Sequence, residues 1–126
     1  PPSKIIYVKG DHRASMWGMH IGRPLLGQRT GDALAALEHA AAIHGRNAST
    51  IHLIAVGQAG PVALHAGALD SRFESVTLRD SIRSWVEDVV AKPGKIDSIS
   101  HIVPSALKKY DLPDLAHVLG DRLTVK

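Results

Sequence analysis

The sequence contains no cysteine, few aromatic residues and no long apolar run. Without cysteine the chain can form neither a disulfide nor a thiolate metal site, and the compartment stays open because secreted proteins can also lack cysteine. Aromatic residues make up only 4% of the chain, which argues against a stacking surface for nucleic acid. No apolar run approaches the roughly 20 residues that span a bilayer, so we expect no membrane partner.

The remaining composition is that of one globular domain. The 126 residues fit a single compact unit, and 44% of them are hydrophobic, mostly Ala, Val, Ile and Leu, which is typical of a parallel sheet packed against helices. The net charge is +3, and Lys108-Lys109 is the only adjacent pair of basic residues, so no basic stripe for nucleic acid emerges. The start, Pro1-Pro2-Ser3-Lys4, is neither a signal peptide nor a natural initiator, so we expect a processing boundary there.

Short apolar runs alternate with stretches of helical periodicity. The pattern predicts strands at residues 4–9, 50–56, 73–79 and 122–125, and helices at 30–45, 61–70 and 112–119. It also predicts a short helix or helical turn at 82–90 and a short helix at 105–110. Thr30 is the expected cap of the first helix, and three glycines with Pro24 predict a long loop at 11–27. The order predicts a three-layer α/β/α sandwich with a mostly parallel sheet of about four strands.

The most informative stretch is the buried strand at 50–56, which turns tightly into a helix. Small residues at Gly57-Gln58-Ala59-Gly60 give this turn the composition of a nucleophile elbow, in which a serine is presented above the sheet near backbone amides. One alignment of the turn puts Gly57 at the nucleophile position, and the other puts Gln58 or Ala59 there. Neither provides a hydroxyl or a thiol, so the sequence predicts no nucleophile at this turn.

The elbow, the helix opening with Asp111-Leu112-Pro113-Asp114-Leu115 and the strand Arg122–Val125 together resemble the α/β-hydrolase superfamily. The resemblance is strongest to its acetyl-xylan-esterase-like branch, in which residues 25–32 resemble the link into the helix before the elbow. It implies that the four strands correspond to strands four to seven of an eight-stranded sheet. It also implies that the acidic triad residue, the histidine loop and one inner strand lie outside this chain, which we therefore expect to be a single partial domain, residues 1–126.

Several other polar residues are candidates for a rearranged site. Asp80 follows a predicted strand, where the carboxyl ends of strands line the cleft of open α/β folds, although a role in capping the loop is the more frequent one. His12, His20 and His101 lie in predicted loops and could act as bases, and Ser81 and Ser84 could replace the nucleophile. His39 and His44 are five residues apart, a poor spacing for a shared metal, so we expect no metal and no cofactor.

Three functions remain open from the sequence. The leading prediction is a non-catalytic α/β-hydrolase-like domain from a larger carbohydrate-esterase-like protein, with a structural or interaction role. It would meet other segments of a parent protein, or a second copy through its sheet edges. The second is a serine ester hydrolase whose triad is completed by another segment or chain. The third is a flavodoxin-like module that binds an anion or nucleotide at the glycine-rich turn.

Overall fold

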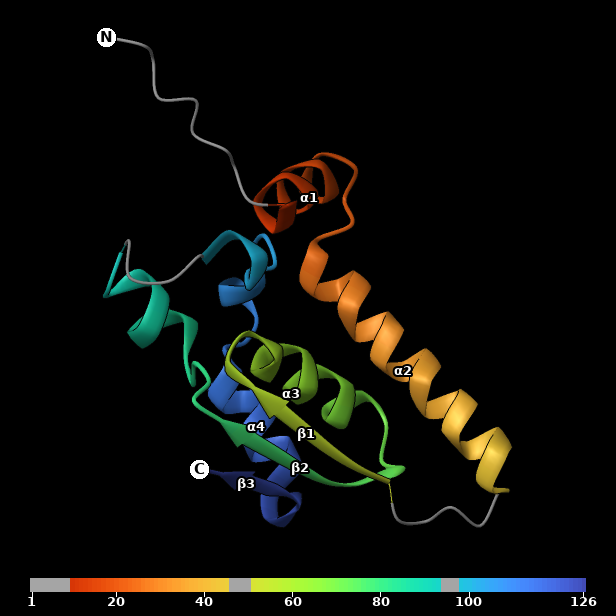
Figure 1. Cartoon of the computed structure of the whole chain (residues 1–126). Coiled ribbons are helices and arrows are strands. Elements are labelled where there is room, and N and C mark those ends of the chain that lie inside the picture. The colour runs from red at the N-terminus through yellow and green to blue at the C-terminus, as the bar shows by residue number, and fades with distance from the viewer. Residues whose placement is uncertain (1–9, 46–50, 94–97) are drawn as a thin grey trace, which may run out of the picture.

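The computed structural model describes residues 10–45, 51–93 and 98–126 and has an α/β architecture (Figure 1). Three strands form its sheet, β1 (Ile51–Val56), β2 (Phe73–Arg79) and β3 (Leu123–Val125). All pair in parallel in the order β1-β2-β3, with Leu53 opposite Val76 and Val76 opposite Leu123. The three strands predicted within the described residues are therefore confirmed. The strand predicted at residues 4–9 lies outside them.

The two crossover helices lie on the same face of this sheet. Helix α3 (Gly60–Leu69) joins β1 to β2, and α4 (Leu112–Leu119) precedes β3, as the sequence pattern predicts. Each strand is added beside the preceding one in the same direction, so right-handed crossovers place both helices on one side (Figure 1). They pack closely, because a Cβ added at Gly67 of α3 would lie 3.0 Å from a methyl group of Leu119 in α4 and 2.6 Å from Val76 of β2.

Inward-pointing residues of the strands and helices form one apolar core. Its buried members include Val76 and Leu78 of β2, Leu64 and Ala66 of α3, and Leu112 of α4. Helix α2 (Leu25–His44) covers α3 from outside and adds Leu26 and Leu37 to this core. The core therefore lies between the sheet and its helices, on one side of the strands.

The opposite face of the sheet carries exposed apolar side chains. Ile54 and Val56 alternate with the buried Ala55 along β1 and are 61% and 59% exposed. No described helix packs on this side of the strands. Within the described residues the sheet thus has one covered face and one open face.

The N-terminal part of the chain differs from the prediction. Residues 11–27 are not a loop, because α1 (Gly10–His20) and the first turn of α2 occupy most of them. Helix α2 begins after Pro24, five residues before the predicted cap, and the Thr30 hydroxyl donates to the Leu26 carbonyl inside the helix (2.9 Å). His12 and His20 therefore belong to a helix and not to loops.

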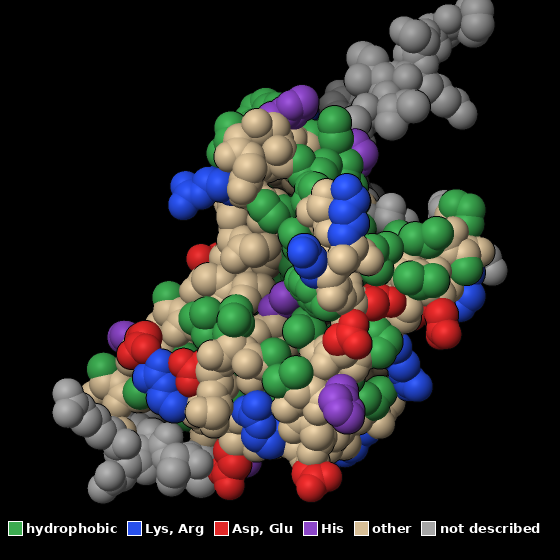
Figure 2. All heavy atoms as spheres, turned by 180° about the vertical axis from the view of Figure 1, so that it is seen from behind, with side chains coloured by type: hydrophobic (Ala, Val, Ile, Leu, Met, Phe, Trp, Pro, Cys, Tyr) green, Lys and Arg blue, Asp and Glu red, His purple; other side chains and the backbone are tan. Residues whose placement is uncertain are grey.

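The segments between β2 and α4 form short turns. Within the short helix or helical turn predicted at 82–90, the structure has a π-helical segment, η2 (Val86–Val90), preceded by Trp85. The helix predicted at 105–110 is a single 3₁₀ turn, η4 (Ala106–Lys108). Figure 2 shows acidic and basic side chains interspersed over the face of the molecule seen from behind. None of the described helices is both long and apolar enough to cross a bilayer.

Candidate functional site

Gly57 is the apex of the turn between β1 and α3. Its φ of +58° lies in the left-handed region, whereas Ala59 has φ −78° and ψ −12° and is already helical. Gln58 does not have a positive φ. A Cβ built on Gly57 would meet no atom within 4 Å, so the space in front of the apex is open. Gly57 is therefore the left-handed residue at the apex of this turn, and it carries no side chain there.

Gly60 begins α3 and is in close contact with Ser81. A Cβ at Gly60 would lie 1.6 Å from the Ser81 hydroxyl oxygen and 2.5 Å from the Ser81 Cβ, so only glycine fits there. The Ser81 hydroxyl donates weakly to the Ile82 carbonyl at 3.3 Å. Ser81 therefore packs beside the first turn of α3 and does not occupy the apex.

A small pocket lies in front of the apex, at the carboxyl ends of β1 and β2. It has a volume of about 150 Å³ and is lined by Gly57, Gln58, Asp80, Ile82 and His101. Asp80 directly follows β2 with a φ of +49°, an unusual conformation for a residue other than glycine. His101 follows the 3₁₀ turn η3 (Ser98–Ser100) and is only 2% exposed. The structure thus brings four of the sequence-predicted site residues into one pocket.

The chemistry available in this elbow pocket is limited. Its polar side chains are an amide, a carboxylate and an imidazole, and no hydroxyl lines it. Its volume is below the roughly 300–1,000 Å³ of usual ligand sites and would hold only a few water molecules. The described residues contain no cluster of three His, Asp or Glu side chains that would hold a metal ion. His12 and His20, on α1, do not line the pocket.

Ser84, the other serine considered from the sequence, has a structural role. It is buried, its hydroxyl donates to a carboxylate oxygen of Asp111 at 2.6 Å, and it accepts from the Glu87 amide at 3.1 Å. The same carboxylate accepts from the amides of Trp85 (2.7 Å) and Leu112 (2.6 Å). Burial alone would raise the pKa of Asp111, but the bonds from Ser84 and these amides outweigh it and lower the pKa below its ordinary value.

An aromatic cluster that the sequence did not point to lies behind this region. The ring of Trp85 is 5.9 Å from that of His65 and 5.6 Å from that of Tyr110. His65 Nδ1 lies 2.6 Å from the Pro61 carbonyl and must donate to it, so Nε2 accepts from the Tyr110 hydroxyl at 2.8 Å. Burial lowers the pKa of His65. Both of its nitrogens are thus occupied in the neutral form, and it has no free position to act as a base.

Fold and site together define an α/β protein with a parallel sheet and a small pocket at the glycine-rich turn between β1 and α3. No protein-family model, curated protein or solved structure matches the chain.

Proposed function

We propose that this chain is a non-catalytic α/β-hydrolase-like domain that contributes sheet core and an interaction surface to a larger carbohydrate-esterase-like protein. One observation carries the proposal: Gly57 combines the positive φ of an elbow apex with an open space in front of it and has no side chain to attack with. Covalent catalysis of ester cleavage needs a nucleophile at that place. The turn keeps the shape of an elbow without its chemistry.

The open face of the sheet supports the structural part of the proposal. A sheet of about four strands between two helical layers would cover Ile54 and Val56, which are largely exposed here. Strands rich in β-branched residues in a parallel sheet are normally covered on both faces of the sheet. We therefore place the contact with the parent protein, or with a second copy, on this face and along the edge of β1.

A second candidate is an ester hydrolase whose triad is completed by another segment. Asp80 and His101 share the elbow pocket and Ser81 lies beside Gly60, which favours this reading over a random scatter of polar residues. The flavodoxin-like alternative is less well supported, because the carboxylate of Asp80 at the turn opposes anion binding. The first two candidates differ in whether a serine is activated.

Fluorophosphonate labelling tests whether this chain itself holds an activated serine, since only such a serine reacts with the probe. We expect the purified chain to remain unlabelled and to hydrolyse p-nitrophenyl acetate no faster than a heat-denatured sample. Ser81→Ala is the critical variant, and Ser71→Ala, at an exposed position, is its matched control. Labelling that disappears in Ser81→Ala and persists in Ser71→Ala would establish the hydrolase and overturn our proposal.

A further inference from the structure

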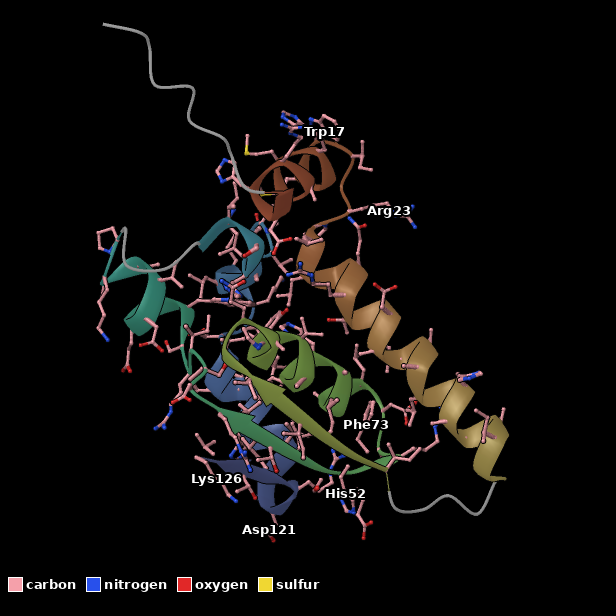
Figure 3. The ribbon with its side chains drawn as sticks, in the orientation of Figure 1. Trp17, Arg23, His52, Phe73, Asp121 and Lys126 are labelled. Carbon is pink, nitrogen blue, oxygen red and sulfur yellow. The ribbon has the colours of Figure 1, made fainter. Side chains whose placement is uncertain are left out.

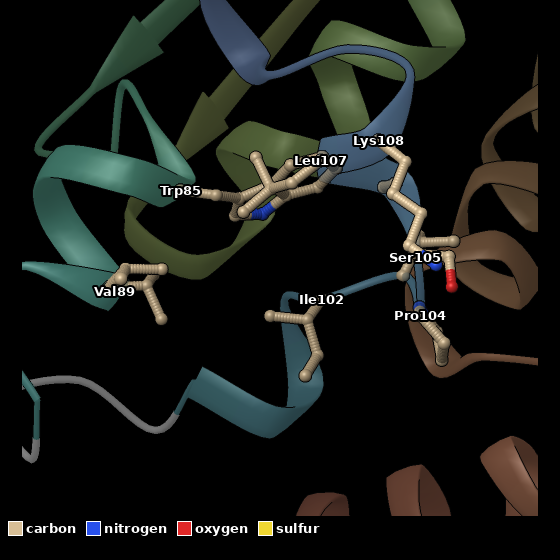
Figure 4. Close-up of a pocket in the computed structure, with 10 residues that line it drawn as sticks. Trp85, Val89, Ile102, Pro104, Ser105, Leu107 and Lys108 are labelled. Carbon is tan, nitrogen blue, oxygen red and sulfur yellow. The ribbon is translucent and has the colours of Figure 1, made fainter.

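A second, larger pocket is lined partly by residues that follow the elbow pocket's His101 in the chain. Its volume is about 570 Å³, within the range of small-molecule sites, and it lies between η2 and the segment 102–108 (Figure 4). His101 lines the elbow pocket, and the next residue, Ile102, lines this one. The two cavities are therefore neighbours with different walls.

The walls of the larger pocket are mainly apolar. Figure 4 shows Trp85 and Leu107 on one side of the space, Val89 across from Pro104 and Ser105, and Ile102 between them. Trp85 is only 2% exposed, and its indole nitrogen donates to the His101 carbonyl at 2.8 Å. Together with the ring contacts to His65 and Tyr110, this bond fixes the indole as a rigid apolar wall. Such a surface favours an apolar ligand body.

The polar side chains of this pocket come from one turn, and the only charge among them is positive. Lys108 and Ser105 line it, and no acidic residue does. Lys108 forms no ion pair with any described residue, in contrast to Lys92, which pairs with Asp88 at 3.3 Å. Ser105 adopts a left-handed φ of +65° at the start of η4, a conformation that needs support from its surroundings. An ammonium and a hydroxyl beside an apolar space complement an anionic group with an apolar tail.

We propose that this pocket binds a small amphipathic monocarboxylate, such as a medium-chain fatty acid. Its hydrocarbon body would lie against Trp85, Val89 and Ile102, and its carboxylate would accept from the Lys108 ammonium and the Ser105 hydroxyl. This binding requires no catalysis and does not depend on the proposed function. Its failure would leave the labelling result unaffected.

The two tryptophans allow a direct binding test. Trp17 is 66% exposed and points away from the body of the protein (Figure 3), so Trp17→Phe leaves Trp85 as the only indole. In this variant we expect monomeric decanoate to change the emission of Trp85 saturably, decan-1-ol to bind more weakly and decylamine to bind most weakly. Absence of a saturable change, or equal binding of decanoate and decan-1-ol, would overturn the proposal.

Two pairs of variants locate the site. Lys108→Gln is expected to weaken decanoate binding about fivefold, as the loss of a partly exposed charge pair would, without affecting decan-1-ol. Lys109→Gln, next in the chain and outside the pocket, should bind decanoate like the parent. Val89→Phe fills the pocket and should abolish binding of both compounds, whereas Val86→Phe, exposed on the same segment, should not. Equal affinity in Lys108→Gln and Lys109→Gln would exclude the lysine from the site.

Discussion

Gly57 and Gly60 shape the turn between β1 and α3 for different physical reasons. Gly57 is needed for its positive φ, and the space around its Cα is open. Gly60 is helical, and it is needed because the side chain of Ser81 lies where a Cβ would be. The first requirement concerns the backbone and the second concerns packing, so substitutions at the two positions fail differently.

Gly60→Ala is expected to lower the free energy of unfolding by about 2–3 kcal/mol, since overpacking of a tight contact costs this much. Adding Ser81→Gly removes both opposing atoms and should restore most of the loss. Gly31→Ala is the matched control: it lies inside α2 with nothing within 4 Å of its Cβ position, so alanine should stabilise by about 0.5–1 kcal/mol. Urea unfolding followed by circular dichroism measures all three. Equal stability of the two alanine variants would contradict the close contact.

Single residues of the site were only partly predictable. Asp80 follows from the rule that polar groups after parallel strands meet at one edge of the sheet. His101 has no such signal, because it reaches the elbow pocket from a turn whose backbone carbonyl, at His101, accepts a hydrogen bond from the Trp85 indole. Ser84 is a candidate nucleophile from the sequence alone. Its structural role depends on a hydrogen bond to Asp111, far along the chain, which the sequence does not show.

At the scale of elements, Asp111 joins α4 to the segment that precedes η2. It caps α4, forming a reciprocal capping box in which the Asp114 carboxylate accepts from the Asp111 amide at 2.8 Å. The Asp111 carboxylate also accepts from Ser84 and Trp85. One carboxylate therefore orients both the start of α4 and the segment that leads into η2. The wall of the apolar pocket thus depends on the cap of α4.

Asp111→Asn is expected to lower the free energy of unfolding by about 2–3 kcal/mol at neutral pH, because an amide group cannot accept all these bonds. The folded pKa of Asp111 is depressed, so its contribution is fully present above the unfolded pKa of about 4 and is lost as the pH falls through the folded value. The stability gap to the variant should therefore be full at pH 7 and shrink at acidic pH. Denaturant unfolding at both pH values, with the exposed Asp121→Asn as control, measures it. A gap that grew on acidification would contradict this role.

Elements with a continuous apolar pattern were predictable, and the N-terminal helices were only partly so. The apolar runs of β1 and β2 and the capped helix α4 match the sequence pattern closely. Helix α1 was missed because glycines usually break helices. Here Gly18 is required within the helix, since a Cβ there would lie 2.4 Å from the Arg23 carbonyl oxygen, and Gly22 supplies the positive φ of the turn that follows. This contact is local in the chain, but the spacing of apolar residues does not show it.

At the scale of the whole molecule, the sheet has helices on one side within the described part of the chain. The apolar run of β1 predicts that both faces of this strand are buried. In the structure, only the side chains that point toward the helices are buried or half-buried. The outward residues keep the same apolar character without a described partner. Local sequence shows that a face is suited to burial, but the covering element can belong to a different part of a protein.

Val56→Thr tests whether this chain alone covers the outer face. Threonine has nearly the shape of valine and a similar preference for strands, so the exchange isolates the burial of one methyl group. Because Val56 is 59% exposed, we expect a change of less than about 0.5 kcal/mol in the free energy of unfolding. The same exchange at Val76, which is fully buried in β2, should cost about 1–3 kcal/mol through the unsatisfied hydroxyl. Equal costs at the two positions would mean that the outer face is already covered in this chain, and the open face would no longer support a docking role.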